Sequence, residues 1–280
     1  MLTRHDLRAV LREKLEKIES ILAMWEAGSH AFERVDEYSD LDIGLLVGEG
    51  TLADAWAAVD GALERVGGFD VRWENPVHIF KGMTQRVYRL RDASPWLHLD
   101  IGIFQEPVED LYLQAQRHGR AEVMFDRTGR VAPPAWDAEK HLRQMREALH
   151  QEVMRWTIYF GFFRKELARG RLVDAFGFYF GLTLRPVLNV LGMLHRPDRW
   201  DYGFRYARED LPADVVARLE RLCYVAEPNQ LLQKLADADA LFNETVTELA
   251  RRGMTPIDAK GLDVLPPAPR RHSKKEPRSC

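Results

Sequence analysis

The chain has 280 residues, with 40 Lys and Arg against 43 Asp and Glu, so its formal net charge of -3 gives no general electrostatic reason to bind nucleic acid. Its two cysteines, Cys223 and Cys280, form neither a metal-ligand spacing nor a disulfide framework, which predicts a reducing, cytoplasmic setting. The N-terminus lacks the apolar core of a signal peptide. The sequence also has no unbroken apolar stretch long enough to predict a membrane span, so no membrane association is expected. The length suits two domains.

The first 27 residues predict a helix followed by a strand. Thr3 and Asp6 form a helix start, and apolar side chains recur after them at helical spacing, at Leu7, Val10, Leu11, Leu15, Ile18 and Leu22. Residues 21–27 then become strand-like and deliver the Gly28-Ser29 turn. Because glycine lets backbone amides approach a phosphate closely, this turn is a candidate phosphate site, although a Gly-Ser pair standing alone is most often only a turn.

Two aspartates, Asp40 and Asp42, stand one residue apart at the start of an apolar strand. Side chains two apart in a strand share a face, so both carboxylates are expected on one side. The core-facing residues are then Leu41, Ile43 and Leu45. Gly44 is expected to leave open space beside the acids. Two adjacent carboxylates repel each other unless they share a proton or a divalent cation, and oxygen ligands favour magnesium. Read alone, Ser39 to Asp42 also suits a helix cap or a loop.

Several strands and a helix are predicted after this segment. Thr51 opens a helix that ends at Gly67-Gly68, and further strands are expected at 69–73, 85–91, 96–104 and 123–126. In the strand 96–104, Asp100 shares a face with His98 and Gly102, and the tripeptide Asp-Ile-Gly of residues 42–44 recurs at 100–102. If the two strands are neighbours, Asp100 completes a three-carboxylate cluster. The alternative is an aspartate on a solvated strand end.

The second half of the chain predicts helices. Pro133-Pro134 marks the expected boundary, so the predicted domains are 1–132, an all-α bundle of about four helices at 133–263, and a disordered basic tail at 264–280. One helix is expected to run from Asp137 toward Gly170, and the next covers 172–194 with Pro186 as a possible kink. Lys165 and Arg169, four residues apart, are candidate phosphate contacts, or else a solvated helix end.

The Gly-Ser pair followed by Asp-x-Asp resembles the signature of the nucleotidyltransferase superfamily that includes DNA polymerase β. The match is closest to the antibiotic-modifying and minimal nucleotidyltransferases, through Gly28, Ser29, Ala31, Ser39, Asp40 and Asp42. Glu33 stands where many members carry a second glycine. The resemblance covers roughly residues 5–127. It implies an α+β fold, with a nucleotidyltransferase-type mixed β-sheet and helices, followed by a helical bundle.

The resemblance also implies a chemistry. Asp40, Asp42 and Asp100 are expected to bind two Mg²⁺ ions as catalytic residues, and Gly28, Ser29 and Ser39 to hold the nucleotide, with Lys165 and Arg169 as further contacts. The implied reaction moves a nucleoside monophosphate, AMP by expectation, from ATP or another nucleoside triphosphate to a hydroxyl of a small acceptor such as an aminoglycoside-like antibiotic. An antitoxin-like enzyme that modifies a protein partner, and a non-catalytic nucleotide-binding module, are the alternatives. The sequence leaves the oligomeric state open.

Overall fold

The computed structural model describes residues 1–258, 260 and 261. The chain divides into two compact units, Met1–Trp136 and the part from Asp137 onward. The basic tail expected at 264–280 lies outside the described residues, and the domain limits drawn from the sequence stay predictions.

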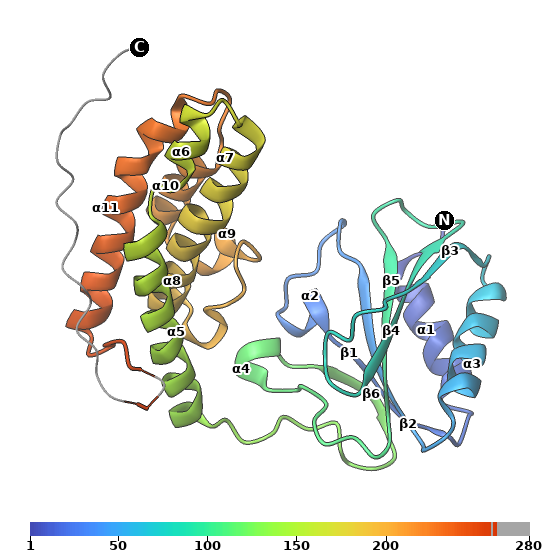
Figure 1. Cartoon of the computed structure of the whole chain (residues 1–280). Helices are drawn as coiled ribbons and strands as arrows, with labels where there is room; N and C mark the ends of the chain where they lie inside the picture. Colours follow the sequence, from blue (N-terminus) through green and yellow to red (C-terminus); the bar gives the residue numbers. More distant parts are fainter. Residues whose placement is uncertain (259, 262–280) are drawn as a thin grey trace. The chain divides into compact units, whose positions relative to one another are not determined.

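The first unit is built on one mixed sheet of six strands in the order β3-β4-β5-β2-β1-β6 (Figure 1). The strands are β1 (Ile21–Glu26), β2 (Leu41–Val47), β3 (Phe69–Glu74), β4 (Met83–Leu90), β5 (His98–Gln105) and β6 (Glu122–Asp126). Its helices are α1 (Arg4–Leu15), α2 (Gly28–Ala31), α3 (Leu52–Glu64) and α4 (Ala115–His118). β2 and β5 run parallel, and the remaining neighbours pair antiparallel.

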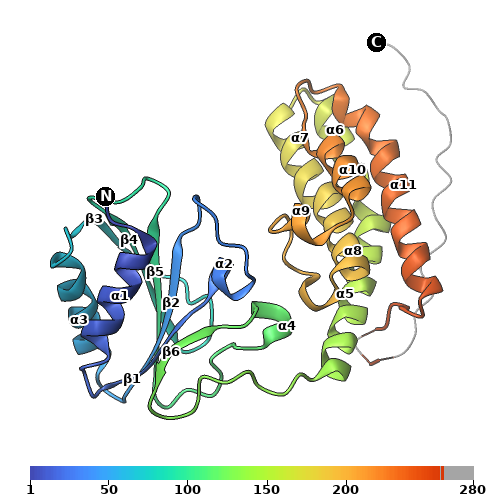
Figure 2. The ribbon, with the colours of Figure 1, turned by 180° about the vertical axis from the view of Figure 1, so that it is seen from behind.

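Helices α1 and α3 cover one face of the sheet (Figures 1 and 2). Thr3 caps α1 by a reciprocal capping box with Asp6. The buried residues of α1 and of β2 belong to one core: Leu7, Leu11, Leu15, Leu41, Ile43 and Leu45. The predicted inward face of β2 is thus confirmed. The expected length of the first helix was wrong, because α1 ends at Leu15 and Leu22 lies in β1.

The opposite face of the sheet carries its own apolar cluster, which includes Trp25, Leu46, Met83 and Phe104. The Trp25 and Phe104 rings stack with centroids 6.0 Å apart. A Cβ added to Gly44 would lie 2.1 Å from the Trp25 indole, so the expectation of open space beside Gly44 was wrong. The glycine is needed because the indole already fills that position.

Gly44 and Gly102 lie at matching positions on β2 and β5, and they are expected to respond differently to alanine. Gly44→Ala should lower the free energy of unfolding by about 1–3 kcal/mol, because the new methyl group overlaps a packed indole. Gly102→Ala should cost clearly less, since its Cβ meets the sulfur of flexible Met83 at 2.6 Å. Urea unfolding of both variants measures the difference, and equal losses would contradict this account of the packing.

The second unit is helical. Its main helices are α5 (Ala138–Tyr159), α6 (Phe163–Ala168), α7 (Leu172–Tyr179), α8 (Arg185–His195), α10 (Ala213–Cys223) and α11 (Gln230–Arg251). Short turns lie at Phe180–Leu184, which is π-helical, at Pro197–Arg199, and at α9 (Ala207–Asp210). One core joins α5, α8, α10 and α11 through residues such as Met145, Leu188, Leu219 and Leu241.

One expectation for this unit is corrected. The helix expected to run toward Gly170 stops at Tyr159, because Gly161 adopts a φ of +70° that a right-handed helix excludes. Pro186 lies within the continuous helical stretch Leu172–His195, as predicted, and directly follows the π-helical turn Phe180–Leu184. Whether it kinks this stretch stays a prediction.

Among the described residues, one helical stretch, Leu172–His195, is long and apolar enough to cross a membrane. The core helix of a soluble protein passes the same test, and 56% of its most apolar window is buried inside the structure.

Candidate active site

The parallel pairing of β2 with β5 brings two of the predicted acids together. Asp42 lies opposite Asp100, and the repeated tripeptide aligns fully, with Ile43 opposite Ile101 and Gly44 opposite Gly102. Neighbouring strands lie roughly 5 Å apart, so the Asp42 and Asp100 side chains start close together. Both carboxylates are half-buried, and both lie on the sheet face opposite α1 and α3. The neighbouring strands required for a carboxylate cluster are therefore present.

The Gly28-Ser29 turn lies directly against Asp42. A Cβ built on Gly28 would fall 1.7 Å from Oδ2 of Asp42, and the Gly28 backbone has a φ of +58°. The backbone N–H of Ala27 donates to the Asp42 carbonyl at 3.0 Å. The Gly28-Ser29 turn and the start of β2 thus meet, although an exposed loop separates them in the sequence. Only glycine fits at position 28.

The hydroxyl of Ser29 is buried, and no hydrogen-bond partner for its Oγ is present among the described residues. Burying a hydroxyl without a partner is costly, so such atoms usually await a ligand or a water molecule. Its position, one residue after Gly28, puts this orphaned group at the turn that the sequence predicts to hold phosphate.

Asp100 is held by an amide that the sequence did not point to. Gln85 of β4 donates through Nε2 to both carboxylate oxygens of Asp100, at 2.8 and 2.7 Å, and accepts from Asn75 at 2.7 Å. Burial raises the pKa of Asp100 above its usual range; the Gln85 hydrogen bonds oppose the shift, and the charge of Asp40 adds to it. Asp40 itself is exposed. Asp40 therefore lies close enough to Asp100 for its charge to act on that carboxyl group.

The donor set fits a divalent cation. Asp42 and Asp100 face each other on neighbouring strands, and a cation would relieve the repulsion between their carboxylates. Within the described part of the chain, the group of three whose ligand atoms all lie within 4.8 Å of one another is Glu26, His30 and Glu122, so the structure does not gather Asp40, Asp42 and Asp100 around one ion.

The loop between the turn and β2 contains two other residues of the motif. The hydroxyl of Ser39 donates to Oδ1 of Asp36 at 2.8 Å, so it closes a local turn, and its contact with a nucleotide stays a prediction. Glu33 has a φ of +57°, in the left-handed region that favours glycine. The backbone here keeps the conformation of the glycine that many superfamily members are expected to carry.

Glu33→Gly should therefore stabilise the protein by about 0.5–1 kcal/mol, because relief of the left-handed strain outweighs the added freedom of glycine in the unfolded chain. Activity should be unchanged. Glu37→Gly is the matched control, since Glu37 lies exposed in the same loop without a positive φ, and it should destabilise slightly. A loss of stability in Glu33→Gly equal to that in Glu37→Gly would contradict the strain argument.

The two basic candidates lie in the second unit. Lys165 of α6 places its Nζ 3.4 Å from the centroid of the Phe162 ring. Arg169 follows α6 and donates to Glu166 at 2.6 Å. Both have partners within their own unit, and their contact with phosphate stays a prediction.

No protein-family model and no curated protein matches the sequence. Fourteen chains of solved structures resemble this chain, and two of them are as follows. An aminoglycoside 6-adenyltransferase from Bacillus subtilis is 12% identical with a TM-score of 0.39, over 90% of this chain and 91% of that one. A nucleotidyltransferase-like protein from Exiguobacterium sibiricum is 14% identical with a TM-score of 0.37, over 88% of this chain and 76% of that one. At these scores neither likeness decides the function of this chain.

Proposed function

We propose that the chain is a nucleotidyltransferase that moves a nucleoside monophosphate, AMP by preference, from a magnesium-bound nucleoside triphosphate to a hydroxyl of a small acceptor. The observation that carries the proposal is the in-register pair Asp42 and Asp100, with Gly28 packed under Asp42. Acids on neighbouring parallel strands, next to a glycine turn, supply cation ligands and a phosphate-binding backbone at one place.

In this proposal each site residue has a separate role. Asp40, Asp42 and Asp100 would hold two Mg²⁺ ions, which when bound activate the attacking hydroxyl and neutralise charge on the phosphates. Gly28 leaves the backbone open for close approach, and the buried Ser29 hydroxyl is available to donate to a phosphate oxygen. Gln85 keeps the Asp100 carboxylate oriented through both of its oxygens.

A cationic acceptor, such as an aminoglycoside, suits this acidic site better than an anionic one, because three carboxylates create a field that attracts positive charge. The helical unit exposes aromatic side chains such as Tyr159, Phe176 and Phe178, and aromatic rings can hold sugars or cations. This supports a small hydroxyl-bearing acceptor, and with it a role in antibiotic resistance.

A labelling experiment tests the proposal. The protein is incubated with Mg²⁺, ATP labelled at the α-phosphate, and a panel of aminoglycosides, lincosamides and plain polyols, and the products are separated by chromatography. We expect label on a small molecule, with release of pyrophosphate. Label that appears only on protein would favour a partner-modifying enzyme, and the absence of pyrophosphate with every nucleotide and acceptor would contradict transferase activity.

A further inference from the structure

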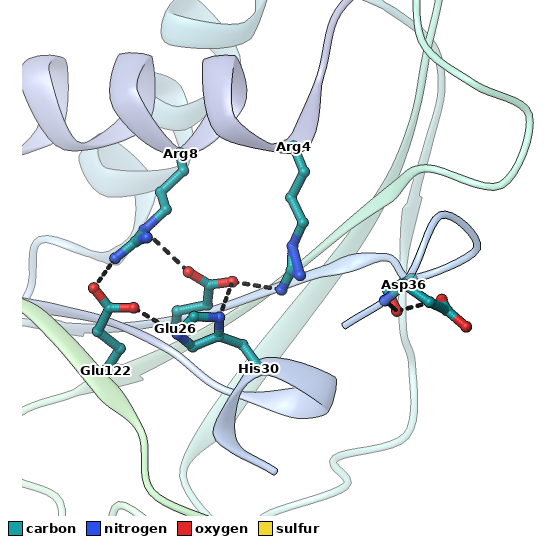
Figure 3. Close-up of polar contacts among 7 residues, drawn as sticks. Arg4, Arg8, Glu26, His30, Asp36 and Glu122 are labelled. Carbon is teal, nitrogen blue, oxygen red and sulfur yellow. Dashed lines mark hydrogen bonds and ion pairs between the residues drawn. The ribbon is translucent and has the colours of Figure 1, made fainter. Parts of the chain in front are cut away.

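A cluster of five charged or titratable side chains lies beside the Gly28-Ser29 turn (Figure 3). We call it the Glu26 cluster. It consists of Arg4 and Arg8 from α1, Glu26 from the end of β1, His30 from α2 and Glu122 from β6. It joins three elements from the start of the chain to β6, which lies about ninety residues further on.

Glu26 is the centre of the cluster and is only 1% exposed. Arg4 donates to its Oε1, and Nε of Arg8 lies 3.0 Å from its Oε2. Arg8 also reaches Glu122, so one guanidinium group bridges both carboxylates (Figure 3). Leaving the buried Glu26 carboxylate without these partners would strongly destabilise the fold. Glu26 is therefore held in place against α1 by the two arginines.

His30 connects this fixed centre to the turn. Its Nε2 lies 2.5 Å from Oε2 of Glu122, and its Nδ1 lies 3.6 Å from Oε1 of Glu26. Burial raises the pKa of Glu122, but the hydrogen bond and charge of Arg8 and the charge of His30 together bring that pKa below its usual range. The imidazole is thus held between the carboxylates of Glu26 and Glu122.

The helix that carries His30 needs such support. α2 has four residues, Gly28–Ala31, and its N-terminus has no side-chain cap. A single turn of helix is unstable by itself, because the entropy lost in fixing its backbone exceeds the free energy gained from its few hydrogen bonds. The backbone offers one further support, since the N–H of Arg120 donates to the Ala31 carbonyl at 2.8 Å.

A metal ion is a less suitable occupant of this cluster. Glu26, His30 and Glu122 each place one ligand atom within 4.8 Å of the others. Two guanidinium groups already pair with the two carboxylates, and an added cation would meet their charge at short range. The geometry favours an ion-pair network.

We propose that His30 is a positioning residue that holds the Gly28-Ser29 turn in the conformation that receives the nucleotide's phosphates. This inference rests on the proposed function. His30 acts through the turn, and it lies only one residue from the orphaned Ser29 hydroxyl. The carboxylates of Glu26 and Glu122 anchor the imidazole, and α1 anchors Glu26.

The test compares wild type with His30→Ala and His30→Gln, with His5→Ala as control, because His5 is exposed in the first turn of α1. Calorimetry measures the Kd for ATP with Mg²⁺, and hydrogen exchange measures protection of the amides of residues 28–32. We expect His30→Ala to bind ATP about tenfold more weakly and to lose protection at the turn, with the melting temperature little changed. In turnover, KM for ATP should rise more than kcat falls. His30→Gln should recover part of the affinity, since its amide can donate to Glu122.

The possible failures differ from one another. If wild type and His30→Ala bind ATP equally and protect the turn equally, the inference is overturned while the proposed function stands. If wild type binds no nucleoside triphosphate, the proposed function falls, and the inference falls with it. Stoichiometric Zn²⁺ binding that wild type shows and His30→Ala lacks would replace the ion-pair network by a metal site.

Discussion

Asp42→Asn should strongly reduce transfer while leaving the fold intact. Asp42 stands at the one position that touches both halves of the site, opposite Asp100 on β5 and against Gly28 of the turn. Replacing the carboxylate by an amide removes a unit of negative charge that the proposed cations need. The loss of transition-state stabilisation should be about 2–4 kcal/mol, a rate decrease of roughly 30- to 1000-fold.

The measurement is initial-rate turnover with labelled ATP, together with circular dichroism to confirm folding. Asp54→Asn is the matched control, because Asp54 is an exposed aspartate in the first turn of α3, and it should keep full activity. Turnover of Asp42→Asn within a factor of three of wild type would remove Asp42 from the proposed machinery.

Gly28→Ala should have the second large effect, on stability as well as on activity. The added methyl group would meet the Asp42 carboxylate at 1.7 Å, and an L-residue at a φ of +58° is strained even in open space. The combined cost should be about 2–4 kcal/mol of unfolding free energy. Because the site residues must shift, transfer should fall by roughly a hundredfold.

Two further variants separate strain from overlap. Gly50 has a φ of +74° and a methyl group added there would meet no atom within 4 Å, so Gly50→Ala carries the strain alone and should cost only about 1 kcal/mol. In Gly28→Ala combined with Asp42→Ala only the contact with the Cβ of residue 42, at 2.9 Å, remains, so the double variant should be more stable than the sum of the single losses predicts. Additive losses in this cycle would contradict the contact between the turn and Asp42.

Parts of the first unit could be predicted closely because their information is local. The alternation of Leu41, Ile43 and Leu45 around the two aspartates indicates both the strand and its buried face, and the structure confirms it. The sequence left open whether the strands that carry the two Asp-Ile-Gly tripeptides are neighbours; the structure pairs them, with the tripeptides in register. The assignment of Asp40, Asp42 and Asp100 as metal ligands stays a prediction.

Other features depend on contacts that no local pattern encodes. The error at Gly44 arose because the space beside a glycine is set by the partner strand, here by Trp25 of β1. Gln85 went unnoticed because its role depends on the pairing of β4 with β5, which brings it within reach of Asp100. The support of the turn by Glu26 and His30 similarly requires α1 and β6 to be in place.

Both strands that carry the paired aspartates lie in the interior of the sheet, with a partner strand on each side. Their backbone amides are therefore committed to ladders in both directions, and the backbone around Asp42 and Asp100 should be among the slowest-exchanging parts of the first unit. A site of this kind has little freedom to adapt its acidic half to a ligand. Any adjustment on binding must come from the turn at Gly28-Ser29 and from side chains, so the rigid half selects the charge of what binds and the turn determines how fast it enters and leaves.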